Sequence, residues 1–130
     1  MSSQPLVSIV VPAYNAASFL DETLDALLSD TYPATEIIVV DDGSTDTTAE
    51  IAIRRAQQHR HIHFVSQPNG GVCRARNRGI AQAVGKYVLP VDADDIICPG
   101  FIEWAVGQME QHPEVSVAVP RAEFFGARQG

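Results

Sequence analysis

The sequence predicts an α/β protein with a mostly parallel β-sheet and helices on both of its faces. Several continuously apolar, β-branched runs occur along the chain, and such runs are typical of strands buried on both faces. They alternate with segments of helical periodicity, which favours parallel strands joined by crossover helices. At 130 residues the chain suits a single domain, residues 1–130.

The individual elements follow from the apolar runs and from local start and stop signals. We expect strands at residues 6–11, 36–40 and 61–66, from residue 87 onward, and at 115–119. We expect helices from about residue 18 to the proline at 33, and at 47–58, 72–84 and 100–111. Pro12 ends the first predicted strand, Ser18 and Thr47 open capping patterns, and Gly85 ends the third predicted helix.

The composition limits the possible partners. Nine Lys and Arg stand against sixteen Asp and Glu, a net charge of -7, and this argues against general nucleic-acid binding. We expect no signal peptide and no membrane span. The two cysteines, Cys73 and Cys98, lack C-x-x-C spacing, so neither a zinc site nor a disulfide framework is indicated. A reducing cytoplasmic location fits, in solution or at the inner face of the membrane.

An acidic cluster follows the strand predicted from residue 87. Asp92 and Asp94 come directly after it, and both carboxylates can turn towards one cation. Mg²⁺ and Mn²⁺ prefer oxygen ligands, and Mg²⁺ is often held by one or two carboxylates together with substrate phosphates. We therefore predict a divalent metal site at Asp94 and Asp92. The alternative is an acidic loop that caps the next helix, and this structural role alone would account for Asp95.

A second acidic cluster, Asp41-Asp42-Gly43-Ser44, follows the second predicted strand. Asp42 can accept a hydrogen bond from a base or a ribose hydroxyl, whereas Asp41 or Ser44 can serve the turn. If the first strand is central, strands two and four flank it. Ligands bind beyond the carboxyl ends of such strands, so Tyr14, Asp42 and Asp92 are expected to line one crevice.

Three arginines alternate along the third predicted helix. Arg74 and Arg78 share one face of it and Arg76 points elsewhere. We interpret Arg74 and Arg78 as solvated side chains and Arg76 as the candidate contact to phosphates.

Other conspicuous residues have plainer interpretations. The histidines at 59, 61 and 63 are expected at an exposed edge, because no nearby carboxylate or cysteine completes a metal site. The two cysteines are interpreted as small packed residues, and Trp104 as a core residue.

Four ordered motifs together carry a resemblance that covers nearly the whole chain. They are Val-Ser-Ile-Val-Val-Pro-Ala-Tyr-Asn at 7–15, Ile-Ile-Val-Val-Asp-Asp-Gly-Ser-Thr-Asp at 37–46, Asn-Gly-Gly with Ala-Arg-Asn-Arg-Gly at 69–79, and Val-Asp-Ala-Asp-Asp at 91–95. In order and spacing they resemble the nucleotide-binding half of family 2 glycosyltransferases, which have the Rossmann-like GT-A fold.

The resemblance implies a role for each candidate residue. Pro12, Tyr14 and Asp42 would contact the nucleoside, Arg76 would approach the nucleotide-sugar, Asp92 would face the ribose or sugar, and Asp94 would bind Mn²⁺ or Mg²⁺ on the diphosphate. Members are typically inverting enzymes that use UDP-, GDP- or dTDP-sugars and transfer the sugar to an acceptor hydroxyl, here of an unidentified saccharide, lipid or protein.

The family's catalytic domains continue well beyond the strand expected at 115–119, and the later half supplies the acceptor site and the usual catalytic base. The resemblance therefore implies a truncated GT-A domain, a donor-binding portion without efficient transfer of its own.

Rival functions fit the sequence less well. A receiver-like Mg²⁺-binding domain needs a lysine after its fifth strand, whereas Lys86, the only lysine, precedes the fourth. A dinucleotide oxidoreductase needs G-x-G-x-x-G after the first strand. A phosphatase with Asp92 as nucleophile leaves Asp42 and Arg76 unexplained. A catalytically incompetent nucleotide-sugar binding module remains the alternative to an enzyme.

Overall fold

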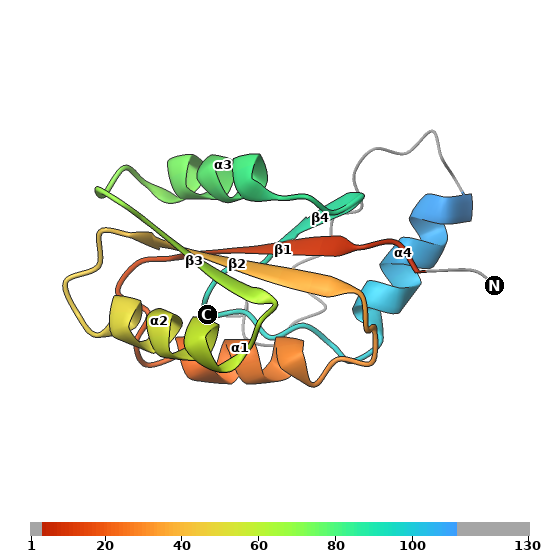
Figure 1. The fold of residues 1–130 in the computed structure, drawn as a ribbon, viewed down its shortest axis with the longest axis horizontal. Coiled ribbons are helices and arrows are strands. Elements are labelled where there is room, and N and C mark those ends of the chain that lie inside the picture. Colours follow the sequence, from red (N-terminus) through yellow and green to blue (C-terminus); the bar gives the residue numbers. More distant parts are fainter. Residues whose placement is uncertain (1–3, 112–130) are drawn as a thin grey trace.

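Four parallel strands form one sheet in the computed structural model, which describes residues 4–111 of the chain (Figure 1). The strands are β1 (Val7–Ala13), β2 (Thr35–Asp42), β3 (Ile62–Gln67) and β4 (Tyr87–Pro90). The helices are α1 (Leu20–Leu28), α2 (Thr48–Gln58), α3 (Val72–Gln82) and α4 (Phe101–Gln111). The sheet order is β3-β2-β1-β4, which confirms the prediction that the first strand is central and flanked by strands two and four.

Helices cover both faces of the sheet, as the apolar runs predict. In Figure 1, α3 lies on one side of the sheet and α1 and α2 lie on the other. The larger apolar cluster joins alternate residues of β1 and β2 to α1, α2 and α4, and the smaller one joins Ile38 and Val40 to Ala75 of α3. Because β1 and β2 are buried on both faces, their positions and the positions of their carboxyl ends are fixed by the core.

The first strand runs through Pro12 to Ala13, so the prediction that Pro12 ends it was wrong. In β1 the amide of Val7 faces β2, and Val10 faces β4 and accepts a hydrogen bond from the Val91 amide. Because successive residues of a strand direct their backbone N and O atoms to opposite neighbouring strands, the backbone nitrogen of Pro12 also faces the β4 side. The pairing of β1 with β4 has already ended there, at Pro90. A residue without an N–H group is tolerated there because no partner strand needs the donor.

The first two helices begin without the predicted caps. Thr47 occupies the N-cap position of α2, but its side chain makes no capping hydrogen bond; α1 begins at Leu20 after Phe19, so Ser18 is not its N-cap residue. The Asp46 side chain instead accepts hydrogen bonds from the amides of Thr48 (2.9 Å) and Ala17 (3.2 Å). One carboxylate therefore serves the start of both helices, and this keeps the loops after β1 and β2 together.

The third helix ends at Gln82, three residues before the glycine expected to end it. Gly85 serves a close approach instead, because a Cβ atom there would lie 2.6 to 2.8 Å from Ser8 and from the Leu6 carbonyl. The strand expected at 115–119 lies outside the described residues. Within residues 4–111, the helices are too short or too polar to cross a membrane.

Three predicted core residues are exposed. Cys73 and Cys98 are both exposed thiols, and Trp104 is 56% exposed. Trp104 follows Phe101 at helical spacing and lies near it, with ring centroids 5.8 Å apart, but it points away from the buried side of α4 formed by Ile102, Val106 and Met109.

Candidate functional site

The carboxyl ends of β1, β2 and β4 meet around two adjoining cavities. One, of about 280 Å³, is lined by Pro12, Tyr14, Asn15, Ala16, Phe19, Val72, Asp92, Ala93 and Asp94. The other, of about 210 Å³, is lined by Pro12, Ala13, Tyr14, Asp42, Asn69, Gly71, Val72 and Ala75. Because three lining residues are shared, we treat the two cavities as one crevice. It brings together all the predicted site residues except Arg76, which lies at its margin.

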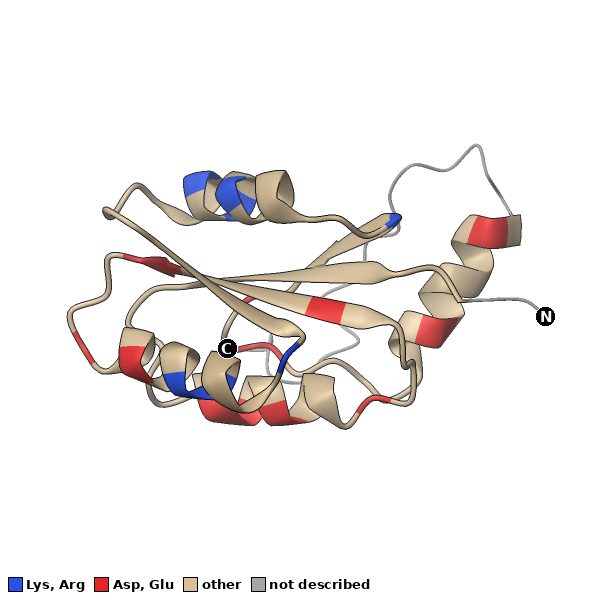
Figure 2. Cartoon of the chain, in the orientation of Figure 1, with Lys and Arg blue, Asp and Glu red and all other residues tan. Residues whose placement is uncertain are grey.

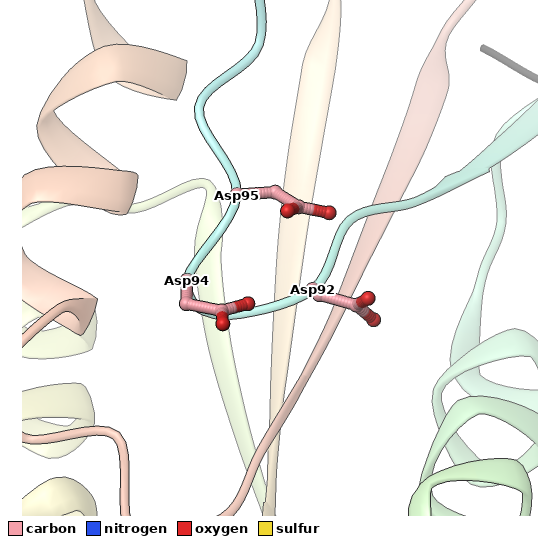
Figure 3. A group of neighbouring side chains, drawn as sticks. All are labelled: Asp92, Asp94 and Asp95. Atoms are coloured by element: carbon pink, nitrogen blue, oxygen red, sulfur yellow. The ribbon is translucent and has the colours of Figure 1, made fainter. Parts of the chain in front are cut away.

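Three carboxylates crowd the loop after β4. One oxygen each of Asp92, Asp94 and Asp95 lies within 4.8 Å of the others, and Figure 3 shows the three side chains projecting from one short stretch of loop. The Asp95 amide donates to the Asp92 carbonyl at 3.0 Å, and the Thr23 hydroxyl of α1 donates to the Ala93 carbonyl at 2.5 Å. Ala93 is thus buried and held in place, and the carboxylates of the neighbouring Asp92, Asp94 and Asp95 lie close together.

This acidic loop fits a hard divalent cation. Carboxylate oxygens suit Mg²⁺ and Mn²⁺, and like charges held this close repel one another unless a cation or protons offset them. Among residues 4–111, it is the one group of three or more potential ligands close enough to share an ion. The structure places Asp95 beside the predicted pair, so three carboxylates are close enough to share an ion.

Within the described part of the chain, the histidines belong to no group of three or more potential metal ligands. His61 lies outside β3, so it does not share a strand face with His63. A carboxylate does approach: the His63 Nε2 atom lies 3.5 Å from Glu36, a buried residue that sequence reasoning did not connect with it.

Arg76 lies beside the acidic loop. Its guanidinium Nη2 atom is 3.6 Å from Asp92 Oδ1, with each side chain about one third exposed (34% and 38%). The Nε atom of Arg76 is buried and has no hydrogen-bond partner in the described structure. A cationic group with an unused donor therefore borders the carboxylates on the α3 side.

Asp42 is enclosed rather than open. Its Oδ1 atom accepts hydrogen bonds from the Gln67 side chain and the Gly70 amide, both at 2.8 Å, and Oδ2 accepts one from the Gly71 amide at 3.0 Å. Burial by itself raises the pKa of this carboxyl, but the hydrogen bonds from Gln67, Gly70 and Gly71 outweigh it, so the pKa lies below its usual value. Asp42 is therefore ionised at neutral pH and fixes the loop that leads into α3.

The loop held by Asp42 depends on a glycine. Gly71 precedes α3 with φ of 97° and ψ of 162°, a conformation that residues with a Cβ atom rarely adopt. Its amide nevertheless points at Asp42, and α3 starts at the next residue. The Asp42 carboxylate and Gly71 together determine where α3 begins beside the crevice.

Tyr14 stands at the mouth of both cavities and is 51% exposed. The neighbouring Asn15 has positive φ and ties the two loops together: its amide donates to Ser44 Oγ at 2.9 Å, and its side-chain oxygen accepts from the Thr45 amide at 2.8 Å. Ser44 also donates its own amide to Asp41 at 3.4 Å, so the pair expected to serve the turn does so.

Sequence reasoning missed two residues that position the site, Gln67 and Thr23. Gln67 ends β3 and is 6% exposed, and a buried carboxamide at a strand end is a signal that could have identified it. Thr23 sits among the leucines of an amphipathic helix, and no local pattern indicates that its hydroxyl reaches Ala93, seventy residues away in the sequence.

Comparison with known proteins gives consistent results. Residues 8–129 match the family model "Glycosyl transferase family 2". The uncharacterized glycosyltransferase YibD of Escherichia coli (strain K12) is 43% identical over 103 residues, which is 79% of this chain and 30% of that protein.

Solved structures agree with the sequence matches. The mannosyltransferase PcManGT from Pyrobaculum calidifontis, in complex with GDP-Man and Mn²⁺, superposes with a TM-score of 0.81 at 30% identity, covering 94% of this chain and 37% of that one. TarS 1-349 of S. aureus in complex with UDP-GlcNAc has a TM-score of 0.76 at 29% identity, covering 92% and 38%. The fold is thus the GT-A fold, and the chain spans well under half the length of these relatives.

Proposed function

Because the chain belongs to family 2 of the glycosyltransferases, we propose that its crevice binds a nucleotide-diphospho-sugar together with a divalent cation, and that the chain is the donor-binding part of a glycosyltransferase. The observation that carries the proposal is the acidic loop beside the two cavities, with three carboxylates within 4.8 Å of one another. A diphosphate is strongly anionic, so it binds next to these carboxylates only if a cation lies between them.

Each residue has a proposed part. Pro12 and Tyr14 flank the base, and Asp94 with Asp92 holds Mn²⁺ or Mg²⁺ on the diphosphate, with Asp95 as an additional ligand. Arg76 offers its unused N–H donor towards the nucleotide-sugar. Asp92 also faces the ribose or the sugar.

The enclosure of Asp42 sharpens its proposed part. A carboxylate offers about four acceptor positions, and Gln67, Gly70 and Gly71 use three of them. Asn69 approaches Oδ2 at 3.4 Å, a long contact. We propose that Asp42 mainly holds the wall of the nucleoside cavity and offers a ligand at most one further hydrogen bond, through Oδ2.

The proposed reaction inverts the anomeric carbon. An acceptor hydroxyl attacks in line, its proton passes to a base, and the nucleoside diphosphate leaves. The bound cation supplies Lewis-acid stabilisation of the departing diphosphate. Asp92, Asp94 and Arg76 position that end of the donor, and we assign the catalytic base to none of the residues described above.

Calorimetric titration with UDP, GDP and dTDP, with and without Mn²⁺, tests the donor site. We expect Mn²⁺-dependent binding of at least one nucleotide, loss of that dependence in Asp94→Ala, and its retention in Glu50→Gln, which removes an exposed carboxylate on α2. Absence of Mn²⁺-dependent binding for all three nucleotides would sink the proposal.

A second candidate, a nucleotide-sugar binding module without turnover, shares this crevice and differs only in catalysis. Release of nucleoside diphosphate from UDP-, GDP- or dTDP-sugars, measured with and without added saccharide acceptors, separates the two candidates. Turnover that Asp94→Ala abolishes supports the transferase, and donor binding without turnover supports the module.

A further inference from the structure

The two flanks of α3 carry arginines in different surroundings. Arg76 lies on the flank that faces Asp92. Arg74 and Arg78, one helical turn apart, lie on the other flank and line an open hollow of about 470 Å³ together with Gln67, Pro68 and Asn77. These five residues line neither cavity of the donor crevice. The hollow is therefore a separate feature of the surface.

The arginines of this hollow form no ion pair in the described structure, although Arg74 lies close enough to Asp42 for its charge to help lower the pKa of that carboxyl. Within residues 4–111, no ion pair or hydrogen bond involves the Arg74 or Arg78 side chain, whereas Arg54, Arg55 and Lys86 all pair with carboxylates. Figure 2 shows basic positions and no acidic ones along α3. On a chain with net charge -7, two adjacent exposed guanidinium groups thus keep their positive field available to a ligand.

The floor of the hollow is fixed by neighbouring contacts. Gln67 is buried and donates to Asp42 at 2.8 Å, so its position does not depend on a ligand. The Arg74 side chain crosses Gly70, where a Cβ atom would lie 2.5 Å from Arg74 Cδ. Asn77 is exposed between the two arginines in the sequence and adds a carboxamide donor. Two cationic forks and one amide therefore border the same space.

We propose that the Arg74–Arg78 hollow is a second anion-binding site, for a phosphate or diphosphate group on a molecule other than the donor nucleotide. Guanidinium groups donate paired hydrogen bonds in a planar fork that matches phosphate oxygens, and residues four apart on a helix can reach one anion together. The site uses no metal ion, because its cations are side chains. This inference goes beyond the proposed donor site and does not depend on it.

Inorganic pyrophosphate in the presence of EDTA is the probe. Without a divalent cation the acidic loop repels this anion, so binding under these conditions reports the arginine hollow. In ¹H–¹⁵N NMR spectra of the whole chain, we expect saturable shifts of the side-chain signals of Gln67, Asn77 and the two arginines, with small changes at Asp92, Ala93 and Asp94.

Variants that remove arginines inside and outside the hollow separate this site from general attraction. Arg74→Gln combined with Arg78→Gln should weaken pyrophosphate binding about tenfold or more. Arg60→Gln removes an exposed arginine elsewhere and should change it less than about twofold. Mn²⁺-dependent nucleotide binding should stay within about twofold in the double variant, which also shows that the variant folds.

Three results would overturn the inference. The first is no saturable shift with millimolar pyrophosphate in the unmodified chain. The second is equal weakening in Arg60→Gln and in the double variant, which would indicate unspecific attraction. The third is loss of EDTA-resistant binding in Asp94→Ala, which would place the anion in the donor crevice. None of these results bears on nucleotide binding with Mn²⁺, so the two proposals fail independently.

Discussion

Two acidic clusters follow strands of the same sheet, yet their carboxylates are in opposite situations. Asp42, after β2, is 3% exposed and receives hydrogen bonds from Gln67, Gly70 and Gly71. Asp92 and Asp94, after β4, crowd Asp95 at the surface of the crevice. Internal donors therefore hold the first carboxylate, whereas the second cluster keeps three carboxylates close together, with Arg76 beside Asp92. Similar residues at similar positions hold the fold together in one place and, under our proposal, bind a ligand in the other.

Removing the Asp42 and the Asp94 carboxylate in turn should change the free energy of unfolding by clearly different amounts. Asp42→Ala leaves three donors without an acceptor, one of them on the buried Gln67 side chain, so we expect a loss of about 2 kcal/mol in the free energy of unfolding. Asp94→Ala relieves repulsion and removes no hydrogen bond or ion pair of the Asp94 side chain within residues 4–111, so we expect a change within about 0.5 kcal/mol. Urea denaturation of the metal-free chains measures both values, and equal losses would contradict the distinction.

Asp94 should matter little for the stability of the free chain but should be required for the stabilisation that bound nucleotide and Mn²⁺ provide. With nucleoside diphosphate and Mn²⁺ at about 100 times their apparent dissociation constant, we expect about 2.7 kcal/mol of added stability in the unmodified chain. Asp94→Ala should gain none, because the link between protein and diphosphate is lost. Thermal unfolding with and without the two ligands gives the comparison, and Glu50→Gln serves as the control of matched charge.

Gln67 offers a smaller change in the same loop. Gln67→Leu keeps most of the side-chain volume and removes one of the three short hydrogen bonds to Asp42, so we expect a loss of about 1 kcal/mol. Urea denaturation again measures it. The double variant with Asp42→Ala should lose less than the sum of the two single losses, because both act on one contact. Strict additivity would mean that Gln67 acts independently of Asp42.

The pH dependence of stability through Asp42 is the smallest of the expected effects. The folded pKa of Asp42 is depressed, so its contribution is complete above the unfolded value near 3.8 and is lost as the pH falls through the folded value. Between pH 7 and pH 4, protonation in the unfolded chain should lower stability by about 0.3 kcal/mol through this group. The difference in stability between the unmodified chain and Asp42→Asn should therefore narrow on acidification, and a widening would contradict the sign.

Much of the architecture follows from the apolar runs, which place β1 and β2 because those two strands are buried on both faces. Local signals were less reliable where tertiary contacts replace them. Pro12 continues a strand because its missing donor faces the side where the ladder has ended, and Asp46, rather than Ser18 or Thr47, serves the helix starts. In both cases the deciding partner lies on another segment of the chain.

The sequence predicts which residues line the site better than it predicts the contacts that those residues make. Asp92, Asp94, Tyr14 and Asp42 do meet at one crevice, because parallel strands end at the same edge of a sheet. The sequence does not reveal that Asp42 is enclosed, since that depends on Gln67 from a third strand. Nor does it reveal that Trp104 and the two cysteines are exposed, because helical spacing alone does not tell which side faces the core.

Paramagnetic relaxation by Mn²⁺ tests most directly the claim that a cation lies at the end of β4. In ¹H–¹⁵N spectra with bound nucleoside diphosphate, replacing Mg²⁺ with substoichiometric Mn²⁺ should broaden the amide signals of residues 92–95 first. Signals of His61 and His63, at the opposite end of the sheet, should stay sharp. Broadening centred on those histidines, or unchanged signals at 92–95 while the nucleotide is bound, would contradict the account.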